Sequence, residues 1–257
     1  MAEDIKKIDI IKKKNFKDLE KKIGIKFKNQ DSLIQAFIHR SFLNEHRDFP
    51  LGHNERLEFL GDAVLELVVT RFLFNSYLNP EGELTNWRAA LVNAKMLAVV
   101  AHEIDFENYL FLSHGEAKDS GTKAREFIMA DAVEALIGAI YTDQGYDMAE
   151  QFITRWISSK LPYVLENGLY MDSKSRFQES SQEFEGVTPN YKVLEETGPD
   201  HDKKFNIGVY LDKKLIAEGV GTSKQEGQTD AAENALKIKK WKGPKINIIT
   251  RKDGDPV

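Results

Sequence analysis

The sequence predicts an all-α domain followed by a small α+β domain with the element order α-β-β-β-α. Three observations predict this organisation: helical periodicity without strand-like alternation between residues 16 and 160, a change of composition near residue 170, and β-branched and aromatic runs after it. The chain has 257 residues, of which 41% are hydrophobic, so each of two domains can bury a core of its own.

Composition excludes several classes of protein. The chain has no cysteine, which rules out a disulfide scaffold, an iron–sulfur cluster, a thiol nucleophile and a cysteine zinc site. Its longest apolar runs are interrupted by charge, and its N-terminus is charged, so we expect neither a membrane span nor a secretory signal, and we expect a cytoplasmic protein. The net charge of −5 means that any nucleic acid must be bound by one basic face rather than by bulk charge.

The first domain is expected over residues 16–165, with a linker at 166–171. Its first helix is predicted in NFKDLEKKIG, where Gly24 is a stop signal. The spacing of apolar residues predicts the remaining helices at 30–42, 54–78, 85–103, 126–142 and 147–165.

The second domain is expected over residues 172–241. A short helix, SRFQESSQEFEG, precedes three predicted strands, NYKVLEETG, KKFNIGVYLD and KLIAEGVGTS. A final helix begins after Ser223, a good N-cap residue. Residues 242–257 lack periodicity and are expected to be a loose tail.

The predicted helix 54–78 is apolar around most of its circumference, which is typical of a buried helix, yet it carries Glu55, Glu58 and Asp62. At about 100° per residue these three carboxylates lie on one strip of the helix. Stacked like charges destabilise a helix, and burying an unpaired carboxylate costs several kcal/mol, so something must compensate.

The predicted helix 126–142 repeats this feature with Asp131 and Glu134 on one face. No Lys or Arg lies between Arg125 and Arg155, so no basic residue is close in sequence. Two apolar helices with inward carboxylates indicate a shared site for a hard cation, Mg²⁺ or Mn²⁺. Such sites are typical of phosphoryl-transfer chemistry. The alternative is that both strips are solvated faces of amphipathic helices.

Several motifs are similar to those of a known family. HNERLEFLGDAVL (53–65) and DAVEALIGAIYTDQG (131–145) resemble the two acidic motifs of the ribonuclease III family. HRSF, EGELTNWRAALVN and GEAKDSGTKAREFIMA match its other landmarks in order, and residues 172–241 resemble its double-stranded-RNA-binding domain. The likeness covers about residues 16–241.

The resemblance implies roles for individual residues. The metal-binding carboxylates would be Glu58, Asp62, Asp131 and Glu134, with Mg²⁺ as the cofactor and Mn²⁺ as a substitute. Asp62 and Glu134 would be the catalytic pair. Glu55 and Glu81 would be supporting acidic residues, whereas Glu66 occupies a position without a fixed acid in the family.

The resemblance also implies an activity: a homodimeric endoribonuclease that cleaves double-stranded RNA by metal-assisted hydrolysis. The products would have 5′-phosphate and 3′-hydroxyl ends with short 3′ overhangs, and the substrates would be ribosomal RNA precursors and mRNA. No membrane and no small-molecule cofactor are expected. A non-catalytic RNA-binding or ribosome-associated protein is the first alternative. A nucleotide phosphohydrolase is the second, and it leaves the second domain unexplained.

Four residues of the second domain are expected to contact RNA. A-form RNA exposes its 2′-hydroxyls in a shallow minor groove, which Gln178 and Glu179 would meet from the first helix and His201 from the first strand loop. Lys224, at the start of the last helix, would meet phosphates.

The last helix departs from the family pattern. Gln225 stands where a second basic residue is usual, Asp230 adds negative charge, and Gly227 costs about 1 kcal/mol of helix stability relative to alanine. We therefore expect weaker and more salt-tolerant RNA binding by this domain.

Overall fold

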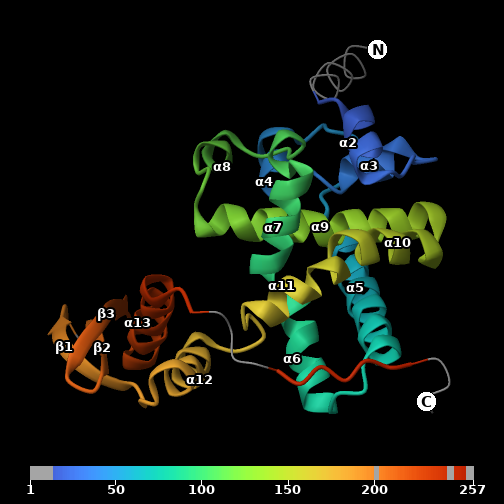
Figure 1. Cartoon of the computed structure of the whole chain (residues 1–257). Helices are drawn as coiled ribbons and strands as arrows, with labels where there is room; N and C mark the ends of the chain where they lie inside the picture. The colour runs from blue at the N-terminus through green and yellow to red at the C-terminus, as the bar shows by residue number, and fades with distance from the viewer. Residues whose placement is uncertain (1–13, 200–202, 242–245, 253–257) are drawn as a thin grey trace. The chain divides into compact units, whose positions relative to one another are not determined.

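The computed structural model describes residues 14–199, 203–241 and 246–252 (Figure 1). The chain divides into two compact units, Met1–Leu161 with Ile249–Val257, and Pro162–Ile248. The predicted fold class, a mostly helical domain and a small α+β domain, is confirmed.

The described part of the first unit is helical. Its two longest helices, α5 (Glu55–Ser76) and α9 (Lys123–Gln144), pack against each other at its centre (Figure 1). The shorter helices around them are α2 (Phe16–Ile23), α3 (Gln30–Gln35), α4 (Arg40–Glu45), α6 (Glu81–Val92), α7 (Ala94–Ile104), η1 (Phe106–Asn108), α8 (His114–Lys118), α10 (Tyr146–Trp156) and η2 (Ser158–Lys160).

The prediction of one helix over residues 85–103 is wrong, because Asn93 separates α6 from α7. Asn93 has an extended backbone (ψ 155°), and its side-chain oxygen accepts a hydrogen bond from Met96 N, 2.9 Å away. Asn93 is thus the C-cap of α6 and the N-cap of α7, where its side chain satisfies a free N–H of the first turn. The apolar period continues across this single residue, so periodicity alone does not reveal the break.

Two further predicted helices are also divided. Residues 30–42 form α3 and α4, and between them Ile38 leaves the helical path to pair with Phe111 in a β-bridge. Residues 147–165 form α10, η2 and α11 (Leu161–Glu166), with a break at Ile157, whose φ is −112°.

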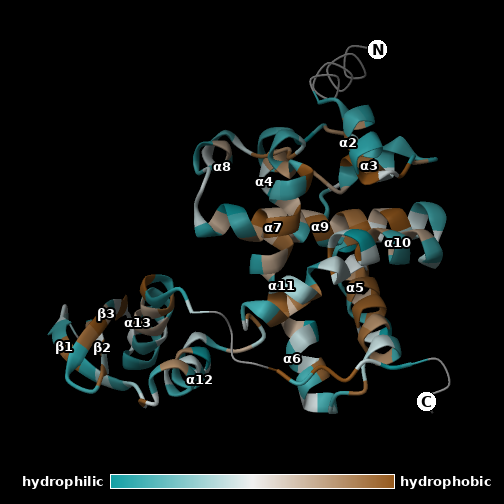
Figure 2. Cartoon of the chain, in the orientation of Figure 1, coloured by the Kyte–Doolittle hydropathy of each residue, from teal (hydrophilic) through white to brown (hydrophobic). Residues whose placement is uncertain are grey.

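The expectation that α5 is buried on most sides is also wrong. One side is buried through Val64, Leu65 and Val68, but Phe59 is 83% exposed and Phe74 is 47% exposed. Figure 2 shows hydrophobic residues along much of α5 and α9. The apolar circumference of α5 therefore exceeds what the other residues that the structure describes cover.

The second unit contains α12 (Ser173–Glu185), a three-stranded antiparallel sheet and α13 (Lys224–Lys239). The strands β1 (Asn190–Thr197), β2 (Lys204–Leu211) and β3 (Lys214–Gly221) pair in the order β1-β2-β3. Both helices contribute to one hydrophobic core with the sheet, formed by Phe177, Val209, Leu211, Ala217, Ala231, Ala232, Ala235 and Leu236.

Within the described ranges, none of the helices has both the length and the apolar character that a membrane span requires.

Candidate metal centre and binding surface

Two glycines bring α5 and α9 into backbone contact. A Cβ atom at Gly61 would lie 1.8 Å from the carbonyl oxygen of Glu134, and one at Gly138 would lie 2.1 Å from that of Leu57. No side chain fits at either position, so the helix backbones touch where they cross. The carboxylates that flank this crossing are therefore held close together.

Three of these carboxylates form a cluster. Side-chain oxygens of Glu58, from α5, and of Asp131 and Glu134, from α9, all lie within 4.8 Å of one another, and the three residues are half-buried. Such an all-oxygen donor set fits a hard divalent cation and does not fit zinc. The cluster can therefore bind a metal, as the sequence predicted for these two helices.

The electrostatics of the cluster favour a cation. Burial, followed by the negative charges of Asp62 and Asp131, raises the pKa of the Glu134 carboxyl to about 8. Burial, followed by the charge of Asp131, raises the pKa of Glu58 to about 7. Burial also raises the pKa of Asp131. Each of these carboxylates is disfavoured in its ionised form, and a bound cation would relieve the repulsion.

Asp62, the fourth predicted ligand, does not belong to this group of three. It is exposed, one helical turn after Glu58. Its charge is nevertheless the first of those that raise the pKa of Glu134, so it lies beside the cluster. The structure thus brings Asp62 near the cluster on its exposed side.

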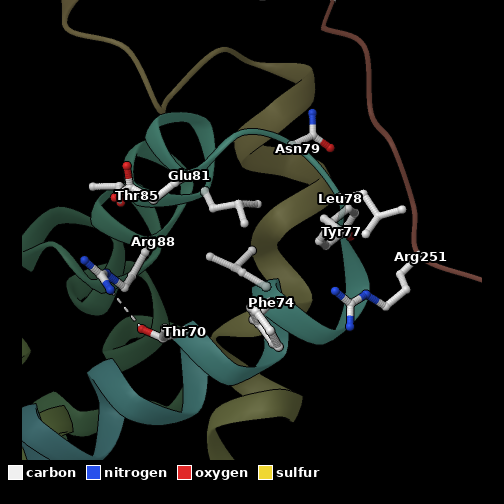
Figure 3. A pocket seen from close by; sticks show the side chains of 11 residues that line it. Thr70, Phe74, Tyr77, Leu78, Asn79, Glu81, Thr85, Arg88 and Arg251 are labelled. Carbon is white, nitrogen blue, oxygen red and sulfur yellow. Dashed lines mark hydrogen bonds between the residues drawn. The ribbon is translucent and has the colours of Figure 1, made fainter. Parts of the chain in front are cut away.

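The supporting acidic residues lie in two places. Glu55 is beside the cluster, because its charge raises the pKa of Glu58, and its carboxylate is 3.7 Å from both Arg40 Nη1 and His53 Nδ1. Glu81 begins α6 and accepts a hydrogen bond from Thr85, 3.0 Å away, at the edge of a different cavity (Figure 3).

Glu66, which the sequence set apart from the metal ligands, forms an ion pair with Arg88 at 3.0 Å. This pairing distinguishes Glu66 from the carboxylates of the cluster.

Gly61 and Gly138, on which the site depends, were not predicted as functional residues from the sequence. The available signal was a glycine inside each helix, because an interior glycine costs about 1 kcal/mol relative to alanine and indicates a packing reason.

Of the predicted RNA contacts, the structure describes three. Gln178 and Glu179 are exposed on α12, and Lys224 is exposed in the first turn of α13. A hydrogen bond of 2.7 Å from Lys174 Nζ to Gln228 Oε1 connects α12 to α13 near their first turns. His201 lies outside the described residues.

The structure explains two of the three departures in α13. Gly227 is buried, and a Cβ there would lie 2.6 Å from Ile207 Cγ1, so this glycine lets the helix approach the sheet closely. Asp230 accepts a hydrogen bond from Val220 N at 2.8 Å, which ties α13 to β3. Gln225 is exposed.

Comparisons with known proteins agree with this architecture. Residues 29–161 match the family model described as ribonuclease-III-like, and residues 173–239 match the double-stranded RNA binding motif. Ribonuclease 3 of Geobacillus sp. (strain WCH70) is 44% identical over 237 residues, covering 91% of this chain and 94% of that protein. Ribonuclease 3 of Bacillus velezensis is 42% identical, covering 86% and 88% respectively.

Solved structures give the same result for the first unit. The nuclease domain of ribonuclease III from Campylobacter jejuni, described for flexibility in a region involved in its dimer formation, superposes with a TM-score of 0.52 and 39% identity. The match covers 58% of this chain and 99% of that domain. The chain therefore belongs to the ribonuclease III family and is a double-strand-specific endoribonuclease.

Proposed function

We propose that this chain hydrolyses both strands of duplex RNA with Mg²⁺, or Mn²⁺ in its place, leaving 5′-phosphate and 3′-hydroxyl ends with short 3′ overhangs. The observation that carries the proposal is the cluster of Glu58, Asp131 and Glu134 at the α5–α9 crossing. In this reaction the oxygen of water forms a bond to phosphorus, the bond from phosphorus to O3′ breaks, and O3′ takes up a proton.

The carboxylates divide the work by position. Glu58, Asp131 and Glu134 would hold the cation, and Asp62, on the exposed side, would complete the set where substrate enters. A divalent cation held by these residues would lower the pKa of a water molecule and stabilise negative charge on the phosphate. We assign the catalytic roles to Asp62 and Glu134, and a supporting role to Glu55 through its charge beside Glu58.

We propose a homodimer because α5 presents an uncovered apolar surface. Phe59, Leu67 and Phe74 are 83%, 57% and 47% exposed, which is unusual for large hydrophobic side chains on one helix. Phe59 is about 22 Å along the helix from Phe74, at 1.5 Å per residue. Two copies with antiparallel α5 helices would place Phe59 of each against the Phe74 end of the other. Glu81 lies at that same end, consistent with a supporting role towards the second copy.

We further propose that the second domain holds RNA through Gln178, Glu179 and Lys224 together with His201. Exposure of the three described residues at α12 and the start of α13 supports this role. We retain as proposals the domain ranges 16–165 and 172–241, the processing of ribosomal RNA precursors and mRNA, and a cytoplasmic location.

The test compares wild type with Glu134→Gln on long duplex RNA in Mg²⁺, with sizing and end analysis of products. We expect short duplexes with 3′ overhangs from wild type, and at least about a thousandfold slower cleavage with intact RNA binding from the variant. Glu126→Gln, an exposed residue of the same helix, is the matched control and should cut normally. If both proteins bind RNA and neither cuts, the non-catalytic alternative replaces the proposal.

A further inference from the structure

The C-terminal segment of the chain is attached to the first unit. Residues 246–252 fall in the expected loose tail, yet Thr250 forms an antiparallel bridge with Tyr77, just after α5. The carbonyl oxygen of Ile249 accepts a hydrogen bond from Leu78 N at 2.7 Å, and Arg251 N donates one to Ser76 O at 2.9 Å. The segment thereby supplies partners to backbone groups at the end of α5, which a helix cannot satisfy internally.

A buried polar side chain forms part of this attachment. Asn79 is 6% exposed, its Oδ1 accepts a hydrogen bond from Ile249 N at 2.8 Å, and its Nδ2 donates to Glu83 at 2.7 Å. Removing the segment would take the Ile249 donor away from a buried amide, which is costly. The contact is therefore a built docking site rather than a chance approach of the chain end.

Arg251, from the docked segment, lines one side of a cavity of about 450 Å³ (Figure 3). The other walls come from the C-terminal half of α5 and the start of α6, including Thr70, Leu84 and Arg88. The Arg251 guanidinium lies 5.0 Å from the centroid of the Phe74 ring, at the edge of the cavity. Arg251 therefore borders the cavity without filling it.

Arg251 is also incompletely satisfied. Its Nε is buried and has no hydrogen-bond partner among the residues that the structure describes. A second copy with antiparallel α5 would present the acidic first turn of its α5, with Glu55 and Glu58, to this end of the cavity. Positive charge at Arg251 is complementary to that surface.

We propose that residues 249–251 are a docked strap that brings Arg251 to the cavity and forms part of the interface with a second copy of this chain. This inference rests on the proposed homodimer. The strap would add a cation and a further edge to the apolar surface around Phe74, and so strengthen association with the acidic first turn of the second copy's α5.

Docking itself is tested by hydrogen exchange at the Leu78 amide in the full-length chain. Ile249→Pro removes the N–H that Asn79 accepts, so the strap should detach and the Leu78 amide should exchange at least tenfold faster than in wild type. Unchanged exchange in this variant would overturn the docking.

The role in association is tested by sedimentation equilibrium. A chain ending at residue 245 should raise the dimer dissociation constant at least tenfold, and Arg251→Ala should raise it about threefold or more. A chain ending at residue 252 keeps the strap and serves as the control. An unchanged or a lower dissociation constant on removal of the strap would overturn the inference. Dimerisation and RNA cleavage are also measured for the wild-type chain. Failure of the proposed function would appear in wild type, whereas failure of the strap proposal would appear only in the comparison with the variants.

Discussion

Both units of this protein use glycine to bring backbones into contact, but the two contacts do different things. At Gly61 and Gly138 the close crossing of α5 and α9 gathers half-buried carboxylates that repel one another. At Gly227 and Gly219 the close approach of α13 to the sheet completes an apolar core and leaves polar side chains outside. The first contact holds together carboxylates that repel one another, and the second completes an apolar core. Unfavourable interactions of the first kind are expected where chemistry occurs.

Gly61→Ala tests the backbone contact between α5 and α9 most directly, and it should have the largest effect. Its Cβ would lie 1.8 Å from a backbone oxygen, which no side-chain movement relieves, so the helices must separate. We expect a loss of about 3 kcal/mol or more in the free energy of unfolding and loss of RNA cleavage. Gly82→Ala is the control, since a Cβ at this α6 position meets nothing within 4 Å and should stabilise by about 0.5–1 kcal/mol. Urea denaturation measures the free energy of unfolding of both variants. Equal effects would contradict the inference that the helix backbones touch at Gly61.

The repulsion in the cluster predicts a pH dependence in the metal-free protein. The pKa of Glu134 is raised from 4.5 to about 8, so between these values the folded state keeps a proton that the unfolded state has released. The free energy of unfolding should therefore fall as pH rises through this window, by about 1–3 kcal/mol after allowance for solvent screening.

Urea denaturation in EDTA across the same window measures that slope. Glu134→Gln should remove much of it, Glu126→Gln should not, and Mn²⁺ added at the upper end should restore stability. Stability that rises with pH in EDTA would show that the cluster is not repulsive.

In the second unit, Gly227→Ala tests the scaffold contact. The nearest obstacle to its Cβ is a side-chain atom of Ile207 at 2.6 Å, and the next is the Phe205 carbonyl oxygen at 3.2 Å. Because Ile207 can shift in part, we expect a destabilisation of about 1–3 kcal/mol, measured by thermal unfolding. The rate of RNA cleavage at saturating RNA should be retained. If the variant were instead more stable than wild type, Gly227 would only lower helix stability and would not be needed for the contact with the sheet.

The smallest expected effect concerns Gln225. Gln225→Lys should raise affinity for duplex RNA about three- to tenfold at low salt and steepen the logarithmic salt slope by about 1, as one added phosphate contact would. Binding to duplex RNA is measured in the presence of Ca²⁺. The control is Asn190→Lys, which adds the same charge at an exposed position on β1. Equal gains in both variants would indicate bulk charge rather than a contact at the start of α13.

The sequence predicted much of the site because carboxylates in an apolar helix conflict with ordinary burial. That conflict pointed to Glu55, Glu58 and Asp62 on one helix and to Asp131 and Glu134 on the other. The family resemblance selected four of these five as metal ligands, and the structure groups three of the four, Glu58, Asp131 and Glu134. The conflict did not identify the helix crossing, since nothing local in the sequence says that Gly61 faces Glu134. The break at Asn93 was missed because the apolar period continues through it. The exposure of Phe59 was not predicted, because periodicity does not distinguish burial within one chain from burial by a second one.

The backbone contact at Gly61 has an evolutionary consequence. Most packed pairs can change together, one side chain growing as its neighbour shrinks, but glycine has no smaller substitute and its neighbour here is main chain. No compensating substitution at position 134 or 138 can make room for a larger residue at 61. Among functional relatives this position should therefore be fixed rather than covarying, and a scan of paired mutations should find no rescue, although Gly61 has no side chain with which to touch the metal.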